Sequence, residues 1–263
     1  MSQNIYDTPT FFTNYASLQR SRQGLDGAPE WPRLRSLLPA SLSGTKILDL
    51  ACGMGWYTRY FHAQGAASVL AIDISENMLA RAREMTAPSA EGITYQRGDL
   101  DDPDAVDRLI PAEADGEYDV VFSALAVHYL SNLSYLVNRV FRVLKPGGVF
   151  VFSTEHPVFT APSVPGFVEV PGKTGDVRRV WPLDQYQVEG VRVTNWLAEG
   201  VRKYHRTTGT YLNMLLGSGF EITGFEEWYP TEEEFRERPE WVEEMRGDRA
   251  KPTFLLVRAK KGL

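Results

Sequence analysis

The chain has 263 residues, of which 43% are hydrophobic and 12% aromatic, and its formal net charge at pH 7 is −6. This composition excludes a disordered chain, and the negative charge argues against a nucleic-acid backbone as the main partner. The N-terminus lacks a basic region followed by an apolar core, and no run of about 18 apolar residues occurs, so we expect a protein that neither spans a membrane nor is exported. Cys52 is the single cysteine and has no zinc-site spacing around it, which predicts no disulfide, no metal site and a cytoplasmic location.

Residues 1–42 are expected to form a helical cap on one large domain that spans residues 1–263. Aromatic side chains share one face of a predicted helix over residues 9–20, with Pro9 in its first turn. A second, shorter helix is predicted over residues 31–38, where a proline follows.

From residue 46 onward, short apolar runs alternate with helical patterns. Ser75 fits the N-cap of one helix, and Lys145-Pro146-Gly147-Gly148 is expected to stop another. Strands that alternate with helices predict an α/β fold whose parallel sheet is covered on both faces. The expected strands cover residues 46–50, 68–72, 93–96, 118–123 and 149–153, and the expected helices cover residues 55–64, 75–85 and 133–144.

Residues 155–206 interrupt this rhythm with mixed proline, glycine, valine and aromatic residues. Alternation around residues 188–193 predicts short antiparallel strands, and we expect this insertion to act as a lid on the substrate side. A helix over residues 207–218 and strands over 220–226 and 253–259 are expected to complete the core. The acid-rich residues 231–249 are expected to form a solvated helix.

A glycine turn and a later carboxylate indicate a nucleoside ligand. Asp49 leads into Gly53 and Gly55, and Asp73 ends the next apolar run, where a carboxylate can bind both ribose hydroxyls. Both dinucleotides and S-adenosylmethionine are bound by such turns. A dinucleotide fingerprint places a third small residue three positions after the second glycine, but position 58 is threonine, so pyrophosphate recognition is poorly supported.

Four motifs occur in a fixed order along the chain: Asp49–Gly55, Ala71–Leu79, Gly98–Leu100 and Leu144–Gly148. In these motifs the chain resembles the Rossmann-like, class I S-adenosylmethionine-dependent methyltransferases, particularly the small-molecule group that includes ubiquinone and menaquinone biosynthesis enzymes. The resemblance implies a doubly wound, mostly parallel seven-stranded sheet with an antiparallel last strand. It also implies S-adenosylmethionine as cofactor and S-adenosylhomocysteine as product.

Position by position, the resemblance also implies roles at the cofactor. The glycines approach the methionyl part, Asp73 holds the ribose, Met78 lies against adenine and Asp99 accepts from the adenine amino group. Tyr15 and Arg20, from the N-terminal helix, are expected to close over the cofactor, with the arginine pairing its carboxylate. The remaining expected cofactor residues are Asp49, Ala51, Cys52, Gly53, Gly55, Ile74, Gly98, Leu100, and the floor residues Ser123, Ala124 and Ala126.

The acceptor side is open to several interpretations. A general base is optional, because the methyl donor is already electrophilic. The candidates for such a base are, in order, His156, His128 and His205. Each of these histidines could instead be a packed hydrogen-bonding group. Further candidates for substrate contact are Tyr129, Glu155, Trp181, Tyr186, Trp196 and Tyr211, and the alternative for the tryptophans is the core of the inserted sheet.

The preferred hypothesis is an enzyme that transfers a methyl group from S-adenosylmethionine to oxygen, nitrogen or carbon of a small, aromatic or apolar metabolite. The alternatives are a noncatalytic S-adenosylmethionine-binding sensor or scaffold and an NAD(P)-dependent oxidoreductase. The sequence leaves open whether the chain acts as a monomer or a homodimer.

Overall fold

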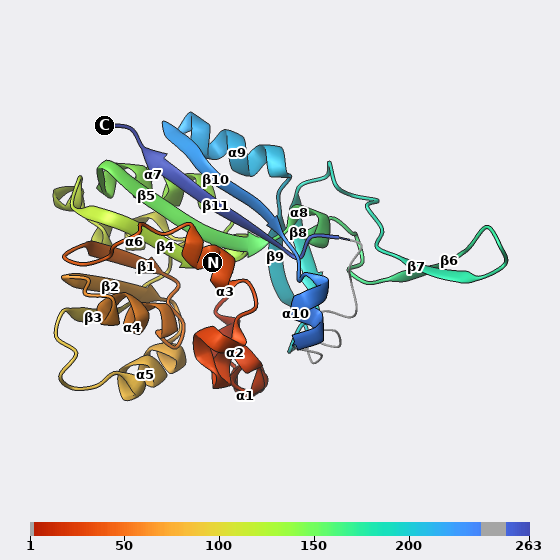
Figure 1. Cartoon of the computed structure of the whole chain (residues 1–263), viewed down its shortest axis with the longest axis horizontal. Helices are drawn as coiled ribbons and strands as arrows, with labels where there is room; N and C mark the ends of the chain where they lie inside the picture. Colours follow the sequence, from red (N-terminus) through yellow and green to blue (C-terminus); the bar gives the residue numbers. More distant parts are fainter. Residues whose placement is uncertain (1–2, 238–250) are drawn as a thin grey trace.

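The computed structural model describes residues 3–237 and 251–263. Its centre is a seven-stranded sheet in the order β10-β11-β5-β4-β1-β2-β3, in which β11 runs antiparallel to both neighbours and the other pairs are parallel (Figure 1). The predicted Rossmann-like α/β class is confirmed. The strands are β1 (Lys46–Leu50), β2 (Ser68–Asp73), β3 (Ile93–Arg97), β4 (Tyr118–Ala124), β5 (Leu144–Glu155), β10 (Phe220–Trp228) and β11 (Phe254–Lys261).

Helices cover both faces of this sheet because neighbouring strand residues point to opposite sides. In β1, Ile47 packs in the cluster that contains Leu34 and Phe61, whereas Leu48 packs in the cluster that contains Val140. The helices in order are α3 (Trp31–Ser36), α4 (Trp56–Ala63), α5 (Glu76–Met85), α6 (Pro103–Leu109), α7 (Leu133–Val143) and α9 (Thr208–Gly217). The 3₁₀ helices are η1 (Ile5–Asp7), η2 (Gly24–Gly27), η3 (Ala112–Ala114) and η4 (Val127–Tyr129).

Two element boundaries differ from the sequence predictions, and one helix was not predicted. The helix predicted over residues 9–20 is divided into α1 (Pro9–Ser17) and α2 (Gln19–Arg22), because Leu18 between them is extended, with ψ 150°. Helix α6 was not predicted; the Asp102 side chain caps it by accepting from the Asp104 N–H. Helix α7 ends at Val143, so the Lys145–Gly148 motif lies inside β5, where the pairing with β4 is irregular.

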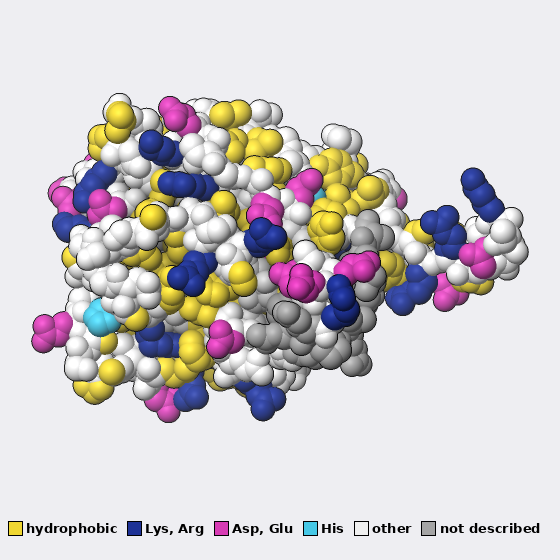
Figure 2. All heavy atoms as spheres, in the orientation of Figure 1, with side chains coloured by type: hydrophobic (Ala, Val, Ile, Leu, Met, Phe, Trp, Pro, Cys, Tyr) yellow, Lys and Arg dark blue, Asp and Glu magenta, His cyan; other side chains and the backbone are white. Residues whose placement is uncertain are grey.

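The insertion contains a short helix and two antiparallel hairpins. These are α8 (Pro157–Thr160), β6 (Val168–Pro171) with β7 (Val177–Val180), and β8 (Gly190–Thr194) with β9 (Val201–His205). The β8–β9 hairpin confirms the predicted antiparallel strands. The β6–β7 hairpin projects from the body, and Figure 2 shows Lys and Arg side chains along it.

The C-terminal acid-rich stretch is described only in part. Helix α10 (Glu232–Glu237) lies at its start, and residues 238–249 of the predicted helix lie outside the described residues. Within the described ranges, no helix combines the length and apolar character needed to cross a bilayer.

Candidate active site

A cavity of about 660 Å³ lies at the carboxyl ends of the parallel strands. Its floor comes from the residues that follow β1, β2, β3 and β4 and from the last residue of β5, and its other walls come from the N-terminal cap and the insertion. Ligands of open α/β sheets bind at this edge, and the volume is within the usual range for small-molecule sites.

The turn between β1 and α4 is held in a left-handed backbone conformation. Ala51, Gly53 and Gly55 have φ values of 58°, 54° and 72°. A Cβ at Gly55 would lie 2.4 Å from the Tyr95 hydroxyl, whereas a Cβ at Gly53 would meet no atom within 4 Å. Gly53 therefore borders the cavity, and Gly55, which does not line it, is required for packing of the turn.

Asp49 also supports the turn from outside the cavity lining. Its Oδ2 accepts a hydrogen bond of 2.6 Å from the Thr58 hydroxyl in the first turn of α4. Burial raises the pKa of the Asp49 carboxyl to about 7, although the bond from Thr58 opposes this shift. The geometry favours the expected role in orienting the turn and gives no direct ligand contact.

Asp73 presents a partly satisfied carboxylate to the cavity. Its Oδ2 accepts from the Gly53 N–H at 2.8 Å, and its Oδ1 accepts from the Ser75 N–H at 2.9 Å. Each carboxylate oxygen keeps a further acceptor direction, which suits the two hydroxyls of a ribose. Burial raises the pKa of Asp73 to about 6, and the two backbone bonds oppose this shift.

Most of the other expected cofactor residues also line the cavity. Arg20 is there, but its guanidinium makes a two-bond ion pair with the fully buried Glu30 at 3.0 and 3.2 Å, so the expected role as the cofactor's main carboxylate partner is not favoured. Asp99 is held in the loop after β3 by accepting from the Asp101 N–H. The lining set comprises Tyr15, Ala51, Cys52, Ile74, Met78, Gly98, Leu100, Ser123, Ala124 and Ala126.

Two polar side chains that were not predicted from the sequence also line the cavity. The Trp56 indole Nε1 and the Ser21 Oγ are buried, and neither has a hydrogen-bond partner within the described part of the chain. Buried donors normally have partners, so both atoms indicate a place for a polar ligand group. Trp56 follows Gly55 directly in the sequence and so begins α4 at the glycine turn.

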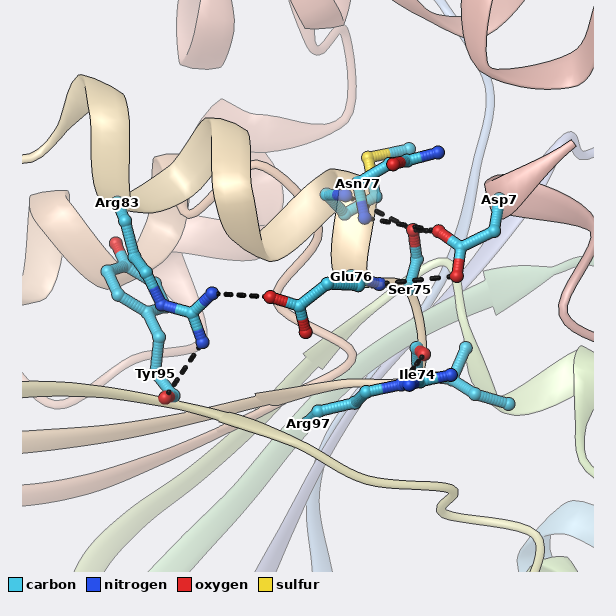
Figure 3. Close-up of polar contacts among 9 residues, drawn as sticks. Asp7, Ile74, Ser75, Glu76, Asn77, Arg83, Tyr95 and Arg97 are labelled. Carbon is cyan, nitrogen blue, oxygen red and sulfur yellow. Dashed lines mark hydrogen bonds and ion pairs between the residues drawn. The ribbon is translucent and has the colours of Figure 1, made fainter. Parts of the chain in front are cut away.

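The N-terminal segment is fastened to the start of α5, beside Asp73. Figure 3 shows Asp7 directed at this helix end, where its carboxylate accepts from the Ser75 hydroxyl at 2.5 Å, from the Asn77 N–H at 3.1 Å and from the Glu76 N–H at 3.3 Å. Negative charge at a helix N-terminus is favourable, and these bonds satisfy N–H groups that have no partner within the helix. Asp7 thereby holds η1 over the cavity.

The structure separates the three candidate histidines. His156 Nε2 lies 2.9 Å from Glu227 Oε1 and its Nδ1 accepts from the Val158 N–H, while His205 contacts the Thr160 hydroxyl and the Tyr186 carbonyl. Both rings therefore have both nitrogens occupied, and neither lines the cavity.

His128 is the histidine that borders the cavity. Its Nδ1 accepts from the Glu155 N–H at 3.3 Å, which assigns the ring proton to Nε2. Burial lowers the pKa of His128 to about 4, and the nearby Glu155 carboxylate opposes this shift. The ring is therefore neutral at pH 7.

The acceptor end of the cavity combines aromatic rings with charged groups. Tyr129, Glu155, Trp181 and Trp196 line it as expected, but Tyr211 is packed in the core and the Tyr186 hydroxyl bonds to Thr208. Sequence reasoning missed several lining residues: Tyr6, Leu125, Phe159, Phe167, Lys203, Lys251 and Phe254. Neither lysine belongs to a local motif: Lys203 comes from β9 of the insertion, and Lys251 comes from the residues just before β11.

Comparison with known proteins agrees with this geometry. Residues 48–152 match the family model described as a methyltransferase domain. A crystal structure of an S-adenosylmethionine-dependent methyltransferase from Mesorhizobium loti is 48% identical, covers 90% of this chain and 100% of its own, and superposes with a TM-score of 0.77. An uncharacterised protein of Haemophilus influenzae is 31% identical over 98% of this chain and 97% of its own.

The chain therefore belongs to the class I S-adenosylmethionine-dependent methyltransferases, and S-adenosylmethionine is its cofactor. The malonyl-[acyl-carrier protein] O-methyltransferase of Pectobacterium atrosepticum is 33% identical over 143 residues, and this chain spans about half of that relative's length, 48%. The oxidoreductase alternative has no support in these similarities.

Proposed function

We propose that this methyltransferase acts on oxygen, nitrogen or carbon of a small, aromatic or apolar metabolite. The observation that carries the proposal is one continuous cavity that joins the cofactor residues to a compartment lined by Tyr129, Trp181 and Trp196. Aromatic side chains supply large apolar contact area to a small ligand. The N-terminal cap and the insertion would enclose the acceptor as parts of a single domain, in the cytoplasm.

The residues present fit the cofactor. Asp73 can receive the ribose hydroxyls, and Met78 and Leu100 offer apolar surfaces to the adenine. The unpartnered Trp56 Nε1 can donate to the carboxylate at the methionyl end, and Ser21 Oγ can bond there as well. When bound, S-adenosylmethionine supplies a sulfonium-activated methyl group.

The protein's own contribution is to align the acceptor and to keep water out. In-line positioning accounts for much of the rate enhancement in such transfers. Ser123, Ala124 and Ala126 would leave room beneath the reacting groups because their side chains are small. The Pectobacterium relative is named for a malonyl-[acyl-carrier protein] acceptor, but its similarity covers only about half of each chain.

Two measurements test this function. Calorimetry should show binding of S-adenosylmethionine and S-adenosylhomocysteine, and a screen of phenols, anilines and apolar carbon acids should yield S-adenosylhomocysteine with at least one class. Cofactor binding without product from any class would favour the noncatalytic sensor, and failure to bind the cofactor would reject both ideas.

A further inference from the structure

A carboxylate oxygen without a partner lies in the acceptor compartment. Glu155, the last residue of β5, lines the cavity together with His128, and its side chain is 14% exposed. Its Oε1 pairs with Lys203 Nζ at 2.5 Å. Its Oε2 is buried and accepts no hydrogen bond from any group in the described ranges.

Lys203 keeps this carboxyl ionised. Burial by itself raises the pKa of Glu155, but the ammonium groups of Lys203 and Lys251 and the His128 ring outweigh it and hold the pKa below its ordinary value. Lys203 is 4% exposed and lies over the Trp196 ring at 4.8 Å, which fixes the ammonium in place. An ionised, buried oxygen that lacks a donor is costly, and a ligand that supplies the donor removes this cost.

The position of Glu155 at the end of β5 places it beside the floor residues of the cavity, where the methyl transfer would occur. The β4–β5 register pairs Ala124 with Ser153, two residues before Glu155, and Leu125 N–H donates to both the Ser153 carbonyl and hydroxyl. The floor residues after β4 and the carboxylate at the end of β5 therefore belong to one corner of the cavity.

We propose that Glu155 is the group that receives the proton-bearing nucleophile of the acceptor, and that the acceptor is a neutral hydroxyl or amine on an apolar framework. This inference rests on the proposed function. The neutral His128 and the Lys203 ammonium, which is paired to Glu155, leave Oε2 as the acceptor atom at this corner.

The proton and electron balance is simple. The nucleophile's lone pair forms the bond to the methyl carbon, the carbon–sulfur bond breaks, and its electron pair neutralises the sulfonium. The O–H or N–H proton becomes strongly acidic as positive charge develops on the nucleophile, so it passes to Glu155 Oε2 and leaves for solvent with the product. A carboxylate of low basicity is sufficient because the transfer is late.

The same geometry disfavours a carboxylate nucleophile at this corner. Such an acceptor has no proton to donate to Oε2 and would place a second negative charge beside Glu155. The preference for a protic acceptor over an acidic one is therefore a direct consequence of the unpartnered oxygen.

The experiment compares three probes on the S-adenosylhomocysteine complex of the full chain: 4-butylphenol, 4-butylaniline and 4-butylbenzoate. We expect calorimetry at pH 7.5 to show that the phenol or the aniline binds at least about tenfold tighter than the benzoate. Glu155→Gln should remove this preference while cofactor affinity stays unchanged. Glu227→Gln, which removes an exposed carboxylate outside the cavity, should behave as the unaltered protein.

A second variant reports on the ion pair. Lys203→Met should raise the pKa of Glu155, so protic-probe affinity should fall as the pH drops from 7.5 to 5.5, whereas it should stay level in the unaltered protein. If Glu155→Gln does not fold, Glu155→Asp keeps the charge and should weaken protic-probe binding by moving the oxygen. The inference would be overturned if the benzoate bound more tightly than the phenol and the aniline, or if Glu155→Gln bound the protic probes as tightly as the unaltered protein. If protic probes bound in a Glu155-dependent way but no acceptor were ever methylated, only the proposed function would be rejected.

Discussion

Two buried carboxyl groups at the cofactor site have pKa values that are shifted by burial. Asp73 and Asp49 both have raised pKa values, and both lie under or beside the glycine turn. Their hydrogen-bond partners come from α4 and from the backbone, so the turn and its carboxylates form one unit. Stability should therefore depend on pH through both carboxyls, and cofactor affinity through Asp73, which lines the cavity.

Asp73 should control cofactor affinity. Asp73→Ala removes two charge-assisted hydrogen bonds to the ribose and should weaken S-adenosylhomocysteine binding by about 1.5–3 kcal/mol. Because protonation removes the charge, affinity of the unaltered protein should fall as the pH drops through about 6, and that of Asp73→Asn should not change with pH over this range. Calorimetry between pH 5 and 8 measures both, and equal affinity in Asp73→Ala would exclude the residue from the site.

Asp49 should make the larger contribution of the two carboxyls to the pH dependence of stability. Its pKa rises from 3.8 to about 7 on folding, so the folded state binds the proton more tightly and stability falls as the pH rises from about 4 to about 7. The full shift corresponds to about 4 kcal/mol as an upper value. Asp49→Asn keeps an acceptor for Thr58 and should flatten this dependence. Urea unfolding at pH 5 and pH 8 tests it; an unchanged difference between the two pH values would contradict the assignment.

Trp56 should hold the methionyl end of the cofactor. Trp56→Phe retains most of the apolar surface but deletes the unpartnered indole N–H, so S-adenosylhomocysteine affinity should drop by about 1–2 kcal/mol with little loss of stability. Trp31→Phe, in the apolar cluster beneath the sheet, is the matched control. Titration with adenosine, which lacks the methionyl part, should show no effect of Trp56→Phe.

At the level of helices and strands, the N-terminal cap is fastened at two places. Asp7 binds the start of α5, and Gln3 bonds to Gly200 and Arg202 at the β8–β9 hairpin, with distances of 2.8 Å in both cases. Asn14 adds a bond of 2.7 Å to the Leu197 carbonyl. The N-terminal cap therefore connects α5, beside the cofactor site, to the β8–β9 hairpin of the insertion.

Loss of the Asp7 contact should loosen this cap. Asp7→Ala removes a capping carboxylate, which is worth about 0.5–2 kcal/mol, and should speed S-adenosylhomocysteine dissociation by up to about tenfold. Stopped-flow displacement measures the rate. Glu84→Ala, on the exposed surface of the same helix, should leave it unchanged, and an equal effect of both variants would assign the change to helix stability alone.

The same elements show where local sequence signals were sufficient. Ser75 caps α5 as its position predicted, accepting from the Met78 N–H. Leu18 gave no such signal, because neither glycine nor proline marks the position at which its extended backbone ends α1. Helix α7 ends at Val143, directly before the Lys145–Gly148 motif, as a helix stop predicts. The motif itself lies inside β5, between Leu144 and Val149, both of which pair with β4.

Across the fold as a whole, stability should be uneven. The central strands are buried on both faces, whereas the β6–β7 hairpin projects from the body with Val177 66% exposed. Hydrogen exchange should therefore be slowest in β1, β4 and β5 and fastest in this hairpin. Added S-adenosylhomocysteine should protect both the β1–α4 turn and residues 3–22. Protection confined to the turn would show that the cap does not close over the cofactor.

The donor site could be read from the chain because its parts lie in short segments. The segment from Asp49 to Gly55, Asp73 and Asp99 lie at or just after the carboxyl ends of β1, β2 and β3. Parallel strands bring these ends to one edge of the sheet. No comparable rule predicts which residues line the acceptor compartment. His156 and Glu155 are neighbours in sequence but face different surroundings, and Lys203, 48 positions after Glu155, becomes its partner only when the inserted hairpin folds back. Such long-range contacts depend on packing rather than on local pattern. The motifs of the sequence were therefore sufficient to predict the methyl donor, whereas the groups that line the acceptor compartment could be identified only in the folded structure.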